Sequence, residues 1–225
     1  MLRELQPSTV IEYPASDGQP MAETGVHVMA IVFALSVLRT FFRRQEDVYV
    51  SGDMFWYYEE GDPTKRLAPD VFVAFGVTTS ERRSWLIWEE KKVPEVVVEV
   101  TSRSTRAEDL GSKKGLYEWL GVQEYFLFDP LDEYLRPRLQ GFRLVNGLYQ
   151  AIPPENDELI SLRLGLHLYA QGDKLRFRNP QTGEPLPFPN EEAEAREAEA
   201  AARRAAEAEV ARLRVELARL RGQLE

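Results

Sequence analysis

The chain has 225 residues, a formal net charge of −9 at pH 7 and no cysteine. Hydrophobic residues make up 44% of it, enough for one core of ordinary size plus an appendage, which excludes a wholly disordered protein. Without cysteine, disulfides and thiolate metal sites are excluded, and two histidines are too few for a histidine-rich zinc site. The acidic balance disfavours a broad nucleic-acid-binding surface but is compatible with a local basic stripe. Any catalysis is therefore expected to use carboxylates and lysines.

The N-terminal part predicts a leader followed by a helix. Residues 8–20 are rich in turn formers, and residues 1–7 lack the apolar core of a signal sequence, so a cytoplasmic protein is expected. A helix is predicted over residues 22–43, with Thr24 as its N-cap. The most apolar part, residues 26–38, is too short to span a bilayer, so no membrane partner is expected. Apolar residues recur at intervals of three and four and predict one wide apolar face: Val28, Ile31, Val32, Leu35, Leu38 and Phe42.

A run of valines opened by Pro94 is the most strand-like stretch of the chain. Residues 95–101 are typical of a central strand buried on both faces, and shorter strands precede it, including one over residues 69–75. Glu99 interrupts the run, and a carboxylate there is costly unless it is paired or binds a cation. The alternatives to a metal ligand are a Glu paired with a buried Arg or Lys and a Glu that faces solvent at the rim of the sheet.

A helix is predicted over residues 109–120, ended by Gly121. Asp109, Lys113 and Tyr117 lie at i, i+4 and i+8, so they share one face of this helix. The face therefore presents a carboxylate, an amine and a phenol together.

The rest of the chain divides into a sheet region and a tail. A strand is predicted over residues 124–129, Asn146-Gly147 predicts a type I′ hairpin, and residues 152–190 are expected to be irregular with short strand-like pieces. From residue 191 onward Ala, Glu, Arg and Leu dominate, and a heptad seam predicts a coiled coil at the end: Val210, Leu213, Leu217, Leu220 and Leu224. The predicted organisation is a leader over 1–21, a folded domain over 22–180, a proline-rich linker over 181–190 and a helical tail over 191–225.

Asp70 and Glu99 would approach each other if their strands are neighbours. Two adjacent carboxylates repel and raise each other's pKa unless a divalent cation lies between them. Mg²⁺ accepts two carboxylates and one backbone carbonyl, for which Val100 is the natural donor, and keeps several waters. Lys113 would then position a water or neutralise charge on a phosphoryl group, whereas the simpler interpretation is an i,i+4 ion pair with Asp109.

These residues resemble the signature of the PD-(D/E)XK nuclease superfamily, and more closely the Uma-type family within it. The resemblance covers roughly residues 10–180, and its most specific part lies between residues 94 and 130. The matching motifs are Pro69-Asp70, the strand end Glu99-Val100-Thr101-Ser102, the helix face Asp109, Lys113 and Tyr117, and Gly121-Val122-Gln123-Glu124-Tyr125. One departure from the superfamily is clear, because Thr101 stands two residues after Glu99 where a lysine is the rule.

The resemblance implies a restriction-endonuclease-like α/β fold, with a mixed central β-sheet flanked by helices, followed here by the long C-terminal helix. It implies Asp70 and Glu99 as metal ligands and Lys113 as the catalytic lysine, with Lys114 as the alternative amine. Glu23 resembles an accessory acid, and Asp53 is a weaker candidate for the same role. Four residues are candidates for phosphate contacts, although loop capping explains the hydroxyls equally well: Thr101, Ser102, Ser104 and Arg106.

Two functional hypotheses follow. The first is an Mg²⁺-dependent endonuclease, with Mn²⁺ as the alternative ion, that hydrolyses DNA phosphodiester bonds through Asp70, Glu99 and Lys113. The second is a catalytically degenerate nuclease fold that serves as a binding or scaffold protein and oligomerises through its tail, which the acidic net charge and the displaced lysine motivate. In either case a homo-oligomer is expected, with a dimer favoured.

Overall fold

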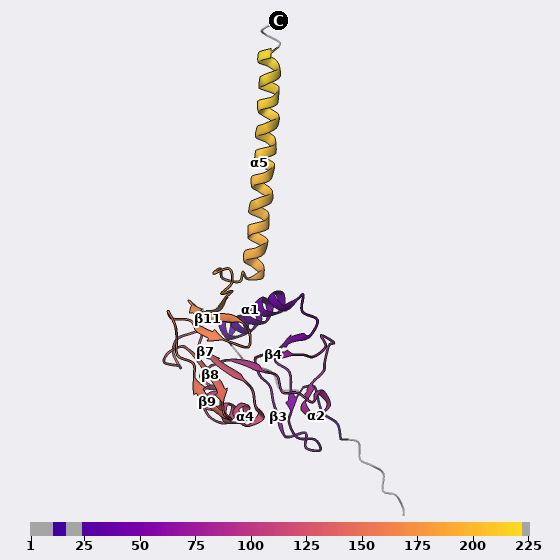
Figure 1. The fold of residues 1–225 in the computed structure, drawn as a ribbon, viewed down its shortest axis with the longest axis vertical. Helices are drawn as coiled ribbons and strands as arrows, with labels where there is room; N and C mark the ends of the chain where they lie inside the picture. Colours follow the sequence, from indigo (N-terminus) through magenta and orange to yellow (C-terminus); the bar gives the residue numbers. More distant parts are fainter. Residues whose placement is uncertain (1–10, 17–23, 222–225) are drawn as a thin grey trace, which may run out of the picture. The chain divides into compact units, whose positions relative to one another are not determined.

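The computed structural model describes residues 11–16 and 24–221 and divides into two compact units, Met1–Leu186 and Pro187–Glu225. Among the described residues, the β-strands belong to the first unit, and the second contains one long helix, α5 (Pro189–Arg221), as Figure 1 shows.

The first unit is built on a six-stranded mixed sheet. Its strands lie in the order β1 (Val48–Ser51), β4 (Val71–Phe75), β6 (Val96–Val100), β7 (Glu124–Phe128), β8 (Leu139–Val145) and β9 (Leu148–Ala151). Each neighbouring pair is antiparallel except β6 and β7, which are parallel. Every residue of β6 is buried, which confirms the predicted central strand. Asn146 and Gly147 join β8 to β9 with φ of 52° and 82°, so the predicted hairpin is confirmed.

Parallel neighbours require a crossover, and two short helices make it between β6 and β7. They are α3 (Arg106–Leu110) and α4 (Ser112–Leu120), so the single helix predicted over 109–120 is wrong. The break lies at Gly111, where a Cβ would approach the carbonyl oxygen of Ala107 to 2.9 Å. Gly121, with φ of 92°, ends α4 as predicted.

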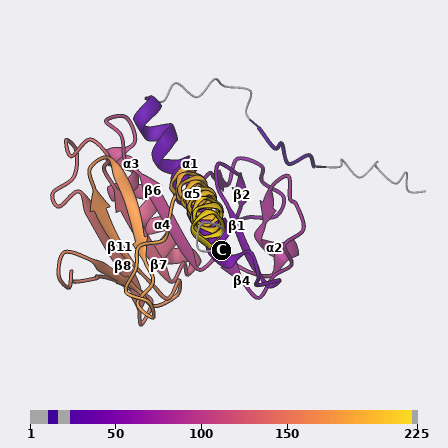
Figure 2. The same cartoon turned by 90° about the horizontal axis from the view of Figure 1, so that it is seen from above.

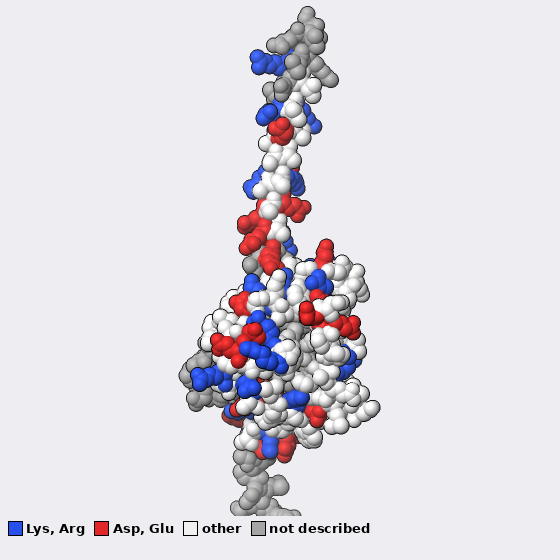
Figure 3. All heavy atoms as spheres, turned by 90° about the vertical axis from the view of Figure 1, so that its left-hand side faces the viewer, with Lys and Arg blue, Asp and Glu red and all other residues white. Residues whose placement is uncertain are grey.

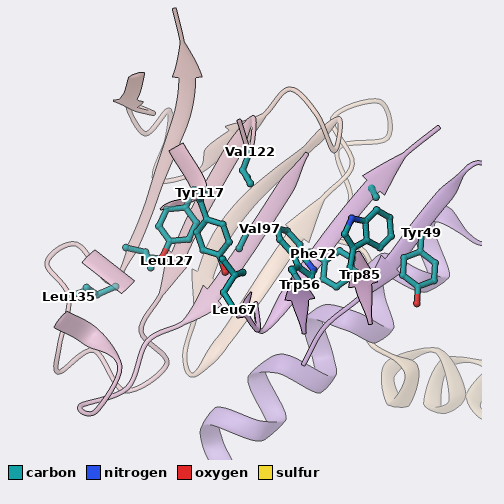
Figure 4. Packing of buried hydrophobic residues seen from close by; sticks show 12 residues of the cluster. Tyr49, Trp56, Leu67, Phe72, Trp85, Val97, Tyr117, Val122, Leu127 and Leu135 are labelled. Carbon is teal, nitrogen blue, oxygen red and sulfur yellow. The ribbon is translucent and has the colours of Figure 1, made fainter. Parts of the chain in front are cut away.

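Helices cover both faces of the central sheet, α1 (Gly25–Phe42) on one side and α4 on the other (Figure 1). Because strand residues alternate between faces, Phe72, Val97 and Leu127 pack with Tyr117 in a single aromatic-rich cluster (Figure 4). On the opposite face the rings of Phe75 and of Phe42 in α1 lie 5.6 Å apart. This mixed α/β arrangement, followed by a C-terminal helix, confirms the predicted fold class.

The first helix forms where it was predicted, and the backbone N–H of His27 donates to the Thr24 hydroxyl, which confirms the N-cap. Its buried face differs from the predicted one: Val28 and Val32 are 45% and 44% exposed, whereas Ala30 and Ala34 are buried. Small side chains on the buried face let the helix approach the sheet closely, a preference that hydrophobic periodicity does not register.

The expectation that this apolar segment is too short for a bilayer is corrected by the length of α1. The helix has 18 residues and meets the length and composition of a membrane span, as the core helix of a soluble protein also does. A third of the helix is buried inside the protein.

Two smaller sheets complete the first unit. One contains β3 (Arg66–Leu67), β2 (Trp56–Tyr57) and β5 (Trp85–Leu86), followed by the single helical turn α2 (Ile87–Glu90); the other contains β10 (Leu159–Ser161), β11 (Leu166–Gln171) and β12 (Lys174–Arg178). The strand-like pieces predicted within residues 152–190, at 167–169 and 175–178, are confirmed as parts of β11 and β12, whereas the expectation that the region is otherwise irregular is wrong, because these strands form a sheet with β10. The buried Glu124 of β7 accepts backbone N–H bonds from Leu162 and Arg163 and so attaches the β10–β11 turn to the central sheet.

The second unit confirms a long helix, which begins at Pro189 and runs to Arg221. Val210, Leu213 and Leu217 are 49%, 47% and 55% exposed in the single chain. The coiled coil itself stays a prediction, and its last seam residue, Leu224, lies outside the described residues.

Candidate active site

Two carboxylates meet where β4 begins and β6 ends. The antiparallel register pairs Val71 with Val98, so one step further Asp70 lies opposite Glu99 with both side chains on the α4 face. The backbone N–H of Asp70 donates to Glu99 Oε2 at 3.4 Å, and that of Val100 donates to Asp70 Oδ2 at 2.7 Å. Residues 29 positions apart in the sequence thus form one acidic pair, in which Glu99 is buried and Asp70 is partly buried.

Helix α4 adds an amine to this pair. Lys113 Nζ lies 3.3 Å from Glu99 Oε2 and 3.1 Å from Asp109 Oδ1. The Glu99 and Asp109 side chains are 0% and 1% exposed, so the lysine neutralises buried charge on both sides. Lys113 therefore makes both the i,i+4 ion pair with Asp109 and the contact with Glu99, so the ion pair does not exclude a role beside the Asp70–Glu99 pair.

Two tyrosine hydroxyls hold the groups around Lys113, one by binding the Glu99 carboxylate and the other by binding the backbone of α3. Tyr117 donates to Glu99 Oε1 at 2.7 Å, which leaves Oε2 as the oxygen that faces Asp70 and Lys113. Tyr125 donates to the backbone carbonyl of Asp109 at 2.9 Å and ties α3 to β7. The motif predicted from the sequence thus becomes one connected cluster, named below the acidic cluster: Asp70, Glu99, Asp109, Lys113 and Tyr117.

The neighbouring lysine points elsewhere. Lys114 Nζ lies 3.5 Å from the centroid of the Phe142 ring. Partial burial lowers the pKa of Lys114 from its ordinary value. The structure therefore places Lys113, and not Lys114, beside the carboxylates.

The other sequence candidates that the structure describes lie in loops or at the start of α3, not on β6 or α4. Glu23 lies outside the described residues, and Asp53 is exposed, with its backbone N–H bonded to the Pro69 carbonyl. Ser102 and Ser104 join their hydroxyls at 2.9 Å, and Ser102 N–H donates to Thr105 Oγ1, which favours the loop-capping interpretation for them. The other two candidates for phosphate contacts differ from these, because Arg106 is exposed at the start of α3, while Thr101 is buried.

Burial dominates the electrostatics of the acidic cluster. It raises the pKa of Asp70 to about 6, against the opposing effects of Lys113 and the Val100 N–H. Burial, and next the Asp70 charge, raises the pKa of Glu99 well above its usual range. Burial alone would lower the pKa of Lys113, but Glu99, Asp109 and Asp70 together raise it above its ordinary value. The amine therefore stays protonated, while burial and mutual repulsion make ionisation of the two carboxyl groups unfavourable.

The donor set fits a hard divalent cation. The buried carboxylates of Glu99 and Asp109 contact one ammonium, and the partly buried Asp70 lies beside Glu99, so full ionisation leaves about two uncompensated negative charges, which a divalent ion would balance. Within residues 11–16 and 24–221 no group of three or more His, Cys, Asp or Glu side chains is arranged to hold a metal ion. A site with two carboxylates suits Mg²⁺, which retains waters, better than an ion that needs a protein cage.

One positioning residue was missed from the sequence. Gly52 passes so close to the start of β4 that a Cβ there would lie 2.0 Å from the Asp70 carbonyl oxygen. The following residue, Asp53, then bonds Pro69 through its backbone. The available signal was an isolated glycine directly after a strand, which often marks a close backbone approach.

Comparison with known proteins assigns the family. The family described as "Uma2: Putative restriction endonuclease" matches residues 2–172. The chain belongs to this family. The Uma2 assignment confirms the family resemblance of the sequence motifs, and the family's description names a restriction endonuclease.

A solved structure and a search of curated proteins complete the comparison. A crystal structure described as "a putative nuclease belonging to DUF820 from Anabaena variabilis ATCC 29413" is 18% identical, with a TM-score of 0.49 over 67% of this chain and 80% of that chain. No curated protein matched this Uma2 chain.

Proposed function

We propose that this Uma2-family chain is an Mg²⁺-dependent endonuclease that hydrolyses DNA phosphodiester bonds at the acidic cluster. The observation that carries the proposal is the convergence of Asp70, Glu99 and Lys113 at the carboxyl end of the central strand: Glu99 Oε2 lies 3.3 Å from Lys113 Nζ and 3.4 Å from the Asp70 backbone nitrogen. Membership of a family of restriction-endonuclease type supports the nuclease class.

Asp70 and Glu99 would hold the cation together with the carbonyl of Val100, and Mn²⁺ would take the same oxygen ligands. The bound cation supplies Lewis acidity, which favours deprotonation of water and offsets charge on a phosphoryl oxygen. The Val100 N–H holds Asp70 Oδ2, and Tyr117 holds Glu99 Oε1, so each ligand keeps one oxygen in a fixed position. Hydrogen bonds that orient the ligand side chains in this way give a metal site a defined geometry.

Lys113 acts as a hydrogen-bond donor rather than as a base. Its pKa is raised by the surrounding carboxylates, so the ammonium persists throughout the physiological range. A persistent ammonium beside the cluster can orient a water molecule and neutralise negative charge that develops on phosphate. Asp109, buried and ion-paired with Lys113, is the residue that positions the amine.

The surface charge is compatible with a locally bound DNA. On the face that Figure 3 shows, Lys and Arg side chains are interspersed with Asp and Glu and do not merge into one broad basic area. Together with a net charge of −9, this favours contacts with a short stretch of backbone over a wide non-specific interface. The degenerate-scaffold alternative loses one of its two grounds, because Lys113 reaches Glu99 from the helix.

We further propose that α5 assembles the protein into a homo-oligomer, with a dimer favoured. A solvated helix of this kind gains stability when a seam such as Val210, Leu213 and Leu217 packs against a second copy. Light scattering of a chain ending at Asn190 tests this proposal: a lower mass than that of the full chain supports α5 as the assembly element, and an unchanged mass contradicts it.

Cleavage of supercoiled plasmid with and without MgCl₂ tests the active-site proposal. Asp70→Asn and Glu99→Gln are each expected to lower Mg²⁺-dependent cleavage on the order of 100-fold or more. Glu95→Gln is the matched control: Glu95 is a second buried carboxylate, just before the same strand, but it bonds the Phe75 N–H and Lys92 instead. Cleavage that survives both active-site changes in folded protein would refute the assignment.

A further inference from the structure

A small cavity lies at the same edge of the sheet as the acidic cluster, with a different lining. It encloses about 130 Å³ between the start of α1, the loop after β6 and the loop after β7, and is called here the Thr101 cavity. Its lining includes Thr24, His27, Thr101, Ser102, Arg103 and Pro130. The volume exceeds that of one water, about 30 Å³ in the liquid, several-fold, so it can accept a small polar group.

One residue that lines this cavity has a buried hydroxyl without a hydrogen-bond partner among the described residues. Thr101 is 1% exposed, and its Oγ1 has no hydrogen-bond partner in the part of the chain that the structure describes. Its backbone N–H is already used, because it donates to the Phe128 carbonyl at 2.7 Å. A buried hydroxyl without a partner costs free energy in the isolated protein and is satisfied when a polar ligand enters.

The remaining lining favours an anion. None of the described residues that line the cavity is Asp or Glu, although the chain holds 37 of them. The 18-residue helix α1, which Figure 2 shows from above, has no acidic residue in its first turn, and this turn carries the positive end of the helix dipole. Arg103 is exposed and forms no ion pair with any residue within the described ranges. These donors match a phosphate or another oxyanion.

The position of Thr101 indicates which phosphate of a nucleic acid would reach the cavity. Thr101 directly follows Val100 and stands two residues beyond Glu99, which is about 7 Å along an extended strand. A nucleic-acid strand with its scissile bond at the acidic cluster would therefore bring an adjacent backbone phosphate to the cavity. We propose that the Thr101 cavity is the subsite for a backbone phosphate next to the one that is cleaved. The identity of this ligand rests on the proposed nuclease function, whereas the preference for an anion does not.

Binding of a short fluorescein-labelled DNA duplex, followed by anisotropy, tests the subsite. Ca²⁺ replaces Mg²⁺ so that a hard cation is present while binding is measured apart from turnover. Thr101→Val is expected to weaken binding about five-fold by removing one hydroxyl donor, and Thr101→Ser to retain the affinity. Arg103→Gln is expected to weaken binding about five- to tenfold and to lower the salt slope by about one.

Arg83→Gln, an exposed arginine in the loop before β5, is the control and should bind as the wild type does. Equal affinities for wild type, Thr101→Val and Arg103→Gln would overturn the subsite, as would equal losses in Thr101→Ser and Thr101→Val or a wild type that binds no duplex. Cleavage with Mg²⁺ is scored separately: a wild type that never cuts contradicts the nuclease proposal, yet selective loss of binding in Thr101→Val and Arg103→Gln would still support the anion site.

Discussion

Replacing Lys113 by methionine removes the one amine that the structure, over its described residues, places against Glu99. The ammonium lies 3.3 Å from Glu99 Oε2, where the attraction amounts to about 5 kcal/mol at an effective dielectric constant of about 20. Removing one partner of a buried pair costs about 3–5 kcal/mol, since the other charge stays unpaired. We expect the free energy of unfolding of the metal-free protein to fall by this amount near neutral pH.

Urea unfolding of matched variants measures this effect. Lys114→Met is the control, because Lys114 only contacts the Phe142 ring and its loss should cost no more than about 1 kcal/mol. The Lys113→Met penalty should shrink near pH 5, because Glu99, with its raised pKa, and Asp70, with a pKa of about 6, are then protonated and leave less unpaired charge. Equal stabilities of the two variants at neutral pH would refute the arrangement of the acidic cluster.

Three further predictions concern the groups around this site. Gly52→Ala should destabilise the protein by about 1–3 kcal/mol in chemical denaturation and impair cleavage, because its Cβ would lie 2.0 Å from the Asp70 carbonyl oxygen. The control Gly115→Ala, with open space around its Cβ, should be neutral or stabilising in the same measurement. Burial raises the pKa of Asp70 from 3.8 to about 6, so the folded state holds this proton more tightly than the unfolded state. Thermal melts of metal-free protein should show stability falling by about 3 kcal/mol as pH rises from about 4 to 6, and Mg²⁺ should restore it above that range; melts that are flat with pH would contradict the shift. Tyr117→Phe should cost about 1–3 kcal/mol and lower kcat more than it raises KM, whereas Tyr149→Phe, which loses a bond to a backbone carbonyl, should leave cleavage kinetics unchanged.

The central strand and its carboxylate were predictable because their signal is local. Four valines around one glutamate between residues 96 and 100 leave few alternatives to a buried strand with a charged group that needs a partner. The choice between Lys113 and Lys114 was harder from the sequence, since the two are adjacent and both lie on α4. The break at Gly111 fixes the rotation of α4, and this rotation sends one amine to Glu99 and the other to Phe142.

The features that escaped prediction depend on contacts between distant segments. The sheet of β10, β11 and β12 forms from short strands whose connecting turn is held by the buried Glu124, a partner far away in the sequence. The buried face of α1 is set by Ala30 and Ala34, whose small side chains fit the sheet although Val28 and Val32 are more hydrophobic. Gly52 acts on Asp70 through backbone proximity alone, which leaves no pattern in the sequence apart from the glycine itself.

Calorimetric titration of the full-length protein with MgCl₂ and MnCl₂ tests the central claim most directly. Two carboxylates of the acidic cluster, Asp70 and Glu99, should bind one divalent cation per chain, with affinity that increases as pH rises, since the cation competes with protons. Glu99→Gln should abolish this binding, while the control Glu95→Gln should retain it. A folded wild-type protein that binds neither ion, or a Glu99→Gln variant that binds as the wild type does, would contradict the proposed active site.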